Sequence, residues 1–206
     1  MRRKRVKAKQ ILIIANGNSI LNHKLGEKID QFETVGRINN FSSAGFEDYV
    51  GTKTDIWFNG ANQGLKRRND LDGKRIIVFV PAGILQRKGD AIHKRIEKRL
   101  GVGINRYELI PYADMQRYEK ISGVTRPTTG LNAILWGLEN FQELIIHGYD
   151  FFIASQTHYN EASWKRWLIE KGLLKKGGKH QLEDEKAFVE AQIASGRIIK
   201  FTEFIK

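Results

Sequence analysis

The sequence predicts an α/β fold in which a mostly parallel sheet is flanked by helices. Short continuous apolar runs recur along the chain. Each is followed by polar or turn residues, as is typical of strands buried on both faces. Segments with apolar residues at helical spacing lie between several of these runs. This alternation favours strands and helices built around one parallel sheet. Such sheets bind ligands at the carboxyl ends of their strands, so functional residues are expected there.

The first expected strand covers residues 11–15 and runs directly into a polar turn. Five further apolar runs predict strands, at 34–38, 55–58, 75–80, 143–147 and 197–201. A helix is expected over 131–138, where apolar residues follow the i, i+3, i+4, i+7 spacing, and another over 92–100, with Lys and Arg on its polar face. A third is expected at about 181–195. The Lys- and Gly-rich stretch 171–180 predicts a mobile loop.

The length of 206 residues is that of one ordinary domain, and a hydrophobic content of 41% is enough for a core. We expect a basic arm at 1–9 and a single domain over 10–206. The chain has no cysteine, which excludes disulfides and thiolate metal sites. No apolar run approaches the roughly 20 residues of a membrane span. The run at 11–15 is too short for a signal peptide.

The chain is strongly basic, with 35 Lys and Arg against 23 Asp and Glu and a formal charge of +12. A surface of this kind attracts phosphates, acidic sugars, nucleic acid or an anionic membrane. Six of the positive residues lie among the first ten. This arm is either a solvated tail or a contact for anionic lipid or nucleic acid. The other basic residues are scattered and no nucleic-acid motif occurs, so nucleic acid is the less favoured partner.

The turn after the first strand reads Asn16, Gly17, Asn18 and Ser19. Its amides and short polar side chains are suited to face a phosphate. It lacks the three spaced glycines of a dinucleotide site, and the region about 20 residues later offers Arg37 and Asn39 in place of an acidic residue. No P-loop sequence is present. Taken alone, the turn is also consistent with an ordinary connection.

Four segments, in order along the chain, resemble the sialylmotifs of glycosyltransferase family 29. G-R-I-N-N at 36–40 and A-G-F-E-D-Y-V-G-T-K-T-D at 44–55 are similar to the large motif. R-P-T-T-G at 126–130, followed by L-I-I-H-G at 144–148, is similar to the small motif, with Thr128 in place of the usual Ser. H-Y-N-E at 158–161 and H-x4-E at 180–185 are similar to the last two. Bacterial sialyltransferases with an Asn-Gly-x-Ser turn are similar in outline.

This resemblance implies a Rossmann-like, GT-A-type catalytic domain that moves sialic acid from CMP-sialic acid to a glycan hydroxyl with inversion. The donor would be a CMP-sugar, and the acceptor a glycan, glycolipid or lipooligosaccharide. No metal or other cofactor is implied. A CMP-Kdo-type or other CMP-sugar transferase remains open, as do a basic nucleotide- or nucleic-acid-binding module and a nucleotide-binding regulator without turnover. Because the family joins its large and small motifs by a disulfide, the absence of cysteine predicts a bacterial or viral relative. It would be cytoplasmic, with peripheral contact at the inner membrane face through the basic arm.

The resemblance implies that His180 is the general base. A neutral imidazole accepts a proton at pH 7, and a position just before a helix helps to keep the imidazole neutral. Glu185 would either orient nearby groups or oppose the effect of the helix dipole that keeps the imidazole neutral. His158 and Tyr159 would steady the departing phosphate. For each of these residues a structural role in a loop or in the core stays open.

The residues expected to bind the donor come from the strand-end turns and from the small motif. They are Asn16, Gly17, Asn18, Ser19, Asn39, Asn59, Arg126, Thr128, Thr129, Gly130 and Gly148. The asparagines are suited to hold phosphate, ribose or base, and Arg126 to face a carboxylate or phosphate. Thr128, Thr129 and Gly130 are suited either to an anion or to a helix cap.

Three further features have structural interpretations. Arg37 is expected to pair with an acidic residue such as Glu47. Asp70-Leu71-Asp72 has the spelling of a metal motif, but its neighbours favour a turn. Among the tryptophans, Trp136 is expected in the core, Trp57 is left open, and Trp164 and Trp167 are candidates to cover an acceptor.

Overall fold

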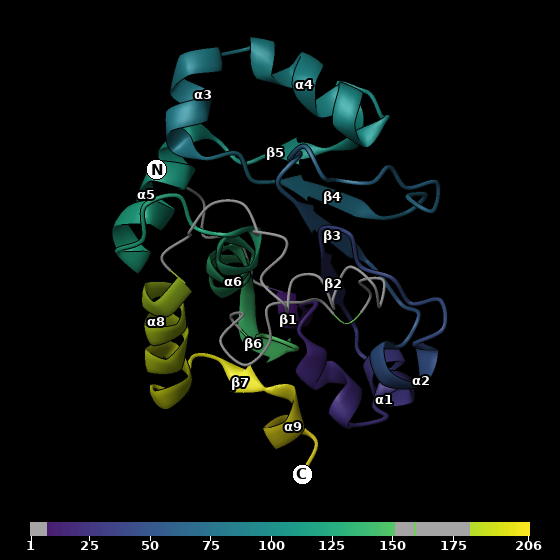
Figure 1. Ribbon diagram of the computed structural model, residues 1–206. Coiled ribbons are helices and arrows are strands. Elements are labelled where there is room, and N and C mark those ends of the chain that lie inside the picture. The colour runs from purple at the N-terminus through teal and green to yellow at the C-terminus, as the bar shows by residue number, and fades with distance from the viewer. Residues whose placement is uncertain (1–7, 151–158, 160–181) are drawn as a thin grey trace, which may run out of the picture.

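The computed structural model describes residues 8–150, 159 and 182–206, and these form one seven-stranded sheet with helices on both faces (Figure 1). The strand order is β5-β4-β3-β2-β1-β6-β7, and every neighbouring pair is parallel. The strands are β1 (Ala8–Ile14), β2 (Val35–Ile38), β3 (Ile56–Asn59), β4 (Arg75–Val78), β5 (Glu108–Leu109), β6 (Phe141–His147) and β7 (Ile199–Lys200). The predicted α/β class with a parallel sheet is confirmed.

Strand β1 lies near the middle of the sheet, and its side chains alternate between two apolar clusters. Ile11 and Ile13 are buried on one face, with residues of α3 (Ala82–Lys88), α4 (Ala91–Leu100), α5 (Tyr112–Ser122), α6 (Thr129–Asn140) and α8 (Leu182–Ala194). Leu12 and Ile14 are buried on the other, with residues of η1 (Asn18–Asn22), α1 (Gly26–Asp30), α2 (Glu47–Val50) and α9 (Phe201–Phe204). A strand covered on both faces has no polar side to show, which explains its uninterrupted apolar run.

The long periodic elements lie close to their predicted positions. Helix α6 covers the predicted 131–138 and α4 the predicted 92–100, while α8 lies within the predicted 181–195. Trp136 is buried in α6, as expected, and Trp57 is fully buried in β3. The strand ends lie at most three residues from their predicted bounds, because chain segments beside a strand can be buried without joining its ladder.

The predicted last strand, 197–201, is largely wrong. Only Ile199–Lys200 pair with β6, and Phe201 begins helix α9. Phe201 is fully buried, and its ring meets Phe32 edge-on at 5.5 Å. The apolar character of residues 197–201 therefore comes partly from Phe201, which packs beneath the sheet and does not belong to a longer strand. The predicted mobile loop at 171–180 lies outside the described residues.

A steric contact at Gly26 yields a first prediction. A Cβ there would lie 1.9 Å from the carbonyl oxygen of Glu47, so α1 and α2 touch through backbone. We expect Gly26→Ala to lower the free energy of unfolding by about 1–3 kcal/mol, or more if the helices cannot separate. The measurement is urea unfolding. The control is Gly83→Ala in α3, where a Cβ meets nothing within 4 Å. It should be neutral or stabilise by about 0.4–1 kcal/mol. Equal effects of the two substitutions would contradict the packing described.

Candidate functional site

A pocket of about 240 Å³ opens at the carboxyl ends of β1, β2 and β6, against the first turn of α6. The parallel sheet brings these strand ends to one edge, where ligands of such sheets bind. Seven of the residues predicted to bind a donor line it, together with Glu185. They are Asn16, Gly17, Asn39, Thr128, Thr129, Gly130 and Gly148. These segments are up to about 130 residues apart in sequence, and the sheet topology is what unites them.

The turns that follow β1 and β6 touch through their backbones. The amide of Gly17 donates to the carbonyl of Gly148 at 2.9 Å. A Cβ on Gly17 would lie 2.5 Å from that oxygen. Gly148 has a φ of +71°, and a Cβ on it would lie 2.9 Å from the carbonyl of Ala15. Both positions therefore require glycine, and this close approach shapes the wall of the pocket.

Two asparagines occupy the ends of neighbouring strands. Asn16 is 8% exposed, and its side-chain amide donates to the carbonyl of Ile38 at 3.0 Å. Asn39 has a φ of +49°, and its backbone is held by the amide-to-carbonyl bond with Phe58 and by the indole of Trp57 at 2.8 Å. Its side-chain oxygen has no partner in the described part of the chain. Buried polar atoms rarely stay unbonded, so this oxygen is available to a ligand.

The small motif forms the start of α6. The Thr128 hydroxyl accepts from the amide of Leu131 at 3.2 Å, so the cap interpretation is confirmed. The carboxylate of Glu185, which is 1% exposed, accepts from the Thr128 amide at 2.7 Å and from its hydroxyl at 2.6 Å. An anion therefore does sit at this helix start, and it belongs to α8. Of the first-turn amides, those of Thr129 and Gly130 remain for a ligand.

Two polar lining residues were not predicted from the sequence. Tyr149 and Asp150 directly follow Gly148 at the end of β6, so the strand-end rule that selected Asn16 applies equally to them. The Tyr149 hydroxyl lies 3.3 Å from the carbonyl of Gly130, and burial raises its pKa well above the usual value. The phenol therefore stays protonated and serves as a donor. Asp150 accepts from the amide of Ser19 at 2.9 Å and from its hydroxyl.

The remaining predicted donor residues are not among the residues that line the pocket. Ser19 and Asn18 begin η1, and Ser19 faces a neighbouring hollow that shares Gly148–Asp150 with the pocket. Asn59 is fully buried, and its side-chain oxygen accepts from the amide of Ala61 at 3.1 Å. Arg126 is exposed and has a φ of +59°. This conformation is costly for a residue before proline, and such strain is found mostly at functional sites.

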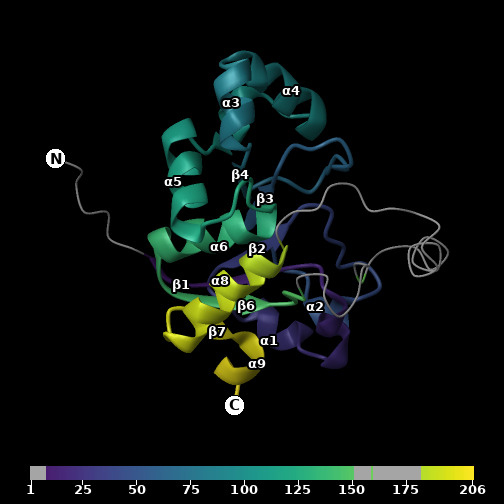
Figure 2. The same cartoon turned by 60° about the vertical axis from the view of Figure 1, so that its left-hand side comes forward.

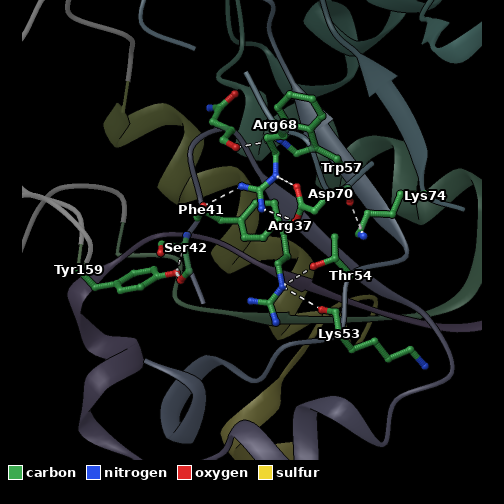
Figure 3. A network of polar contacts seen from close by, with 11 residues as sticks. Arg37, Phe41, Ser42, Lys53, Thr54, Trp57, Arg68, Asp70, Lys74 and Tyr159 are labelled. Atoms are coloured by element: carbon green, nitrogen blue, oxygen red, sulfur yellow. Dashed lines mark hydrogen bonds and ion pairs between the residues drawn. The ribbon is translucent and has the colours of Figure 1, made fainter. Parts of the chain in front are cut away.

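Tyr159 packs within the core and not among the described lining residues. It is 2% exposed, and its hydroxyl donates to the Ser42 carbonyl and accepts from the Ser42 amide (Figure 3). Its ring meets Phe46 edge-on at 5.1 Å, and its amide donates to the carbonyl of Asn16. Tyr159 thus holds the loop after β2 to the turn after β1. His158 and His180 lie outside the described residues, as do Trp164 and Trp167.

Arg37 does not pair with Glu47, so that prediction is wrong. The guanidinium is fully buried and donates to the carbonyls of Lys53 and Val50 and to the Thr54 hydroxyl (Figure 3). Burial lowers its pKa to about 10, which leaves it charged at pH 7. Peptide carbonyls of an adjacent loop replace the expected carboxylate, because the loop folds over the end of β2.

The Asp70-Leu71-Asp72 segment lies in a turn, as its neighbours indicate. The Asp70 carboxylate accepts two hydrogen bonds from the guanidinium of Arg68, at 2.9 and 2.7 Å (Figure 3). This pairing lowers the pKa of Asp70. The carboxylate thus has a structural partner in Arg68.

Comparisons with known proteins confirm the resemblance that the motifs indicate. The family model for glycosyltransferase family 29 (sialyltransferase) matches residues 2–83. The human CMP-N-acetylneuraminate-beta-1,4-galactoside alpha-2,3-sialyltransferase is 22% identical over 94% of this chain and 57% of its own length. The human CMP-N-acetylneuraminate-beta-galactosamide-alpha-2,3-sialyltransferase 4 is 26% identical over 97% of this chain and 66% of its own. The chain therefore spans between about half and two thirds of these relatives.

Solved structures share the fold. A mammalian sialyltransferase superposes with a TM-score of 0.67 at 16% identity, covering 94% of this chain and 69% of that one. A mammalian sialyltransferase in complex with Gal-beta-1-3GalNAc-ortho-nitrophenol gives 0.65 at 17% identity, with the same coverage. The α/β sheet with flanking helices is thus that of a sialyltransferase structure.

The predicted cytoplasmic location, in a bacterial or viral relative, is wrong. The relatives are mammalian sialyltransferases. The prediction rested on the absence of cysteine. That absence excludes disulfides but does not indicate the compartment. Among the described residues, no helix is long and apolar enough to cross a membrane.

The Thr128–Glu185 pair yields a second prediction. We expect Glu185→Gln to lower the free energy of unfolding by about 1–3 kcal/mol, because an amide group would then face one of the two Thr128 donors. The matched control is Glu190→Gln on the same helix, where the carboxylate is exposed and pairs with Lys186 at 3.5 Å. Its effect should stay within about 0.5 kcal/mol. Urea unfolding at pH 7 measures both. A change at Glu185 no larger than at Glu190 would show that the buried bonds contribute nothing.

The end of β6 yields a third prediction. His147 is 7% exposed, and burial, assisted by His23, lowers its pKa from 6.5 to about 4. Between pH 6.5 and pH 4 the imidazole is protonated in the unfolded chain but stays neutral in the folded chain. The free energy of unfolding therefore decreases as the pH falls through this range. The free energy of unfolding of the wild-type protein should fall between pH 7 and pH 4.5. In His147→Phe we expect this fall to be smaller by about 2–3 kcal/mol, as measured by urea unfolding at both pH values. Identical pH dependence of the two proteins would contradict the assignment.

Proposed function

We propose that this chain is a sialyltransferase that moves sialic acid from CMP-sialic acid to a hydroxyl of a glycan. The observation that carries the proposal is the pocket at the ends of β1, β2 and β6, where residues of the large and small motifs meet. The family 29 match over residues 2–83 and the sialyltransferase relatives support it. We further propose that residues 10–206 form one catalytic domain of the GT-A type that needs no metal.

The proposed reaction breaks the bond between the anomeric carbon of sialic acid and the phosphate oxygen of CMP. The acceptor hydroxyl forms the new bond from the opposite face, so the configuration inverts, and CMP leaves with the electron pair. Positive charge develops on the sugar ring in the transition state, as at other glycosidic centres. The protein must then hold the nucleotide, stabilise the departing phosphate and accept the proton of the hydroxyl.

The described residues are suited to the first two tasks. The amides of Thr129 and Gly130 lie at the positive end of α6, which favours a phosphate. The protonated phenol of Tyr149 donates to the Gly130 carbonyl and so holds the end of β6 against the start of α6. The side-chain oxygen of Asn39 is free to accept from the cytosine amino group or from a ribose hydroxyl.

The proton-transfer role is assigned to His180 from its motif. It precedes α8 by two positions in the sequence, and α8 is fixed to the pocket through Glu185. A neutral imidazole there would take the acceptor proton. His158 is proposed to face the departing phosphate, and Tyr159 to position the segment that carries His158. Contact of the basic arm with an anionic membrane surface completes the proposal.

The fourth prediction tests this proposal by separating binding from turnover. CMP at about 100 times its dissociation constant should add roughly 2.7 kcal/mol to the free energy of unfolding, whereas UMP, AMP and NAD should not. With CMP-sialic acid and N-acetyllactosamine, CMP release should depend on the acceptor. We expect His180→Ala to lose about 10²- to 10⁴-fold in kcat while it keeps the stabilisation by CMP.

The matched control is His93→Ala, since His93 lies on α4 and bonds Tyr107 away from the pocket. It should keep turnover. CMP-Kdo in place of CMP-sialic acid tests the alternative donor. The absence of any response to CMP would refute the proposed donor site. Full turnover of His180→Ala would refute the assigned base and leave the donor site standing.

A further inference from the structure

The positive charge of the folded part is concentrated in one stretch of the chain. Residues 60–106 contain 12 Lys and Arg but only four Asp and Glu. This stretch builds β4, α3, α4 and η2 (Ile104–Arg106), and α4 lies at the end of the molecule opposite α9 (Figures 1 and 2). The donor pocket is formed by other segments of the chain. This end of the molecule therefore presents a second surface, with its own chemistry.

Seven cations lie on α4 and on two segments beside it, the loop before β4 and η2, and we call them the basic patch. They are Lys66, Arg67, Lys94, Arg95, Lys98, Arg99 and Arg106. Arg67 donates to the carbonyl of Lys98 at 2.9 Å, and Arg99 to that of Gln63 at 3.4 Å. Arg106 donates to the carbonyl of Leu71 at 3.1 Å. These bonds to carbonyls fix the loop before β4 and η2 beside α4 without neutralising any charge.

The fold compensates little of this charge, since Glu97 is the one acidic residue of α4. In the described residues no member of the basic patch has an ion-pair partner, whereas nearby Arg75 pairs with Glu108 at 2.9 Å. Lys94 and Lys98 are like charges four residues apart on α4, as are Arg95 and Arg99, and such pairs destabilise a helix. The helix dipole favours cations only in the last turn. An anionic partner outside the chain would relieve the remaining repulsion.

An exposed aliphatic side chain stands next to these cations. Ile104 is 49% exposed at the tip of η2, and its amide donates to the carboxylate of Glu97 on α4 at 2.9 Å. Few large hydrophobic side chains are this exposed among the described residues. An aliphatic tip flanked by cations suits a bilayer, which offers phosphates and acyl chains at one surface. Single-stranded nucleic acid is bound instead through stacked aromatics, and here the nearby ring of Tyr107 packs on His93.

We propose that the basic patch and Ile104 form a docking surface for an anionic lipid bilayer. The cations would lie at the headgroups, and Ile104 would enter the boundary between headgroups and acyl chains. Four to eight clustered Lys and Arg are the number typical of surfaces that bind anionic lipid. The inference is independent of the transfer reaction, because none of these residues lines the donor pocket.

The fifth prediction is tested by co-sedimentation of the full chain with phosphatidylcholine vesicles that contain phosphatidylserine. Each cation near the surface contributes about fivefold to the partition coefficient. A triple variant that combines Lys94→Ala, Arg95→Ala and Lys98→Ala should therefore lose about 100-fold. Ile104→Ser should lose several-fold, and its residual binding should depend more steeply on salt. Pure phosphatidylcholine vesicles should bind the wild-type chain weakly.

The matched control removes the same charge elsewhere, through Lys28→Ala, Lys120→Ala and Lys206→Ala at exposed positions away from the patch. Both triple variants keep the basic arm, so its contribution cancels. Urea unfolding of both confirms that they fold. Equal losses in the two triple variants would overturn the proposal, as would wild-type binding that ignores phosphatidylserine. Tighter binding of duplex DNA or RNA than of the vesicles would assign the surface to nucleic acid and would also overturn it.

Discussion

Two hydrogen bonds from Thr128 to the carboxylate of Glu185 connect the parts of the candidate site. A buried carboxylate is costly to desolvate, and here an amide, a hydroxyl and a helix start together offset that cost. The pair ties α8 to the first turn of α6, so the first turn of α8, with Leu182 and Glu185, lines the pocket. The carboxylate also accepts from the Thr128 amide, so a ligand at this helix start can bond only to the amides of Thr129 and Gly130. This contact fixes the side of the pocket that α6 and α8 form, while the sheet topology and the Gly17–Gly148 contact fix the other.

The buried guanidinium of Arg37 explains why the large motif is long. The residues that contact it, Val50, Lys53 and Thr54, belong to the same motif and supply two carbonyls and a hydroxyl. The second half of the motif therefore packs over the end of β2 and fixes the backbone that presents Asn39. A motif identified by its chemistry thus consists partly of residues that touch no ligand site and hold the ligand-facing residues in place.

Sequence patterns predicted what depends on local periodicity and on strand ends. Helix α6 and strands β1 and β6 were predicted because their apolar residues are continuous or regularly spaced. The helix α5 was not, because only Met115 and Tyr118 of its side chains are buried. The partners of Arg37 are carbonyls, which every residue carries, so no pattern singles them out. The bond between Glu185 and Thr128 spans 57 residues and depends on how α8 packs, which no local signal records.

The central pairing of β1 with β6 has a consequence for synthesis of the chain. Residues 8–14 pair on one side with β2, but on the other side with residues 141–147. At ribosomal rates, the second edge of β1 stays open for on the order of ten seconds after the first strands emerge. An open strand edge is a template for pairing with other chains. The contact that ties α8 to the pocket forms later still, because Glu185 lies 38 residues beyond β6, so the nascent chain acquires its complete ligand site only after the whole sheet edge has been synthesised.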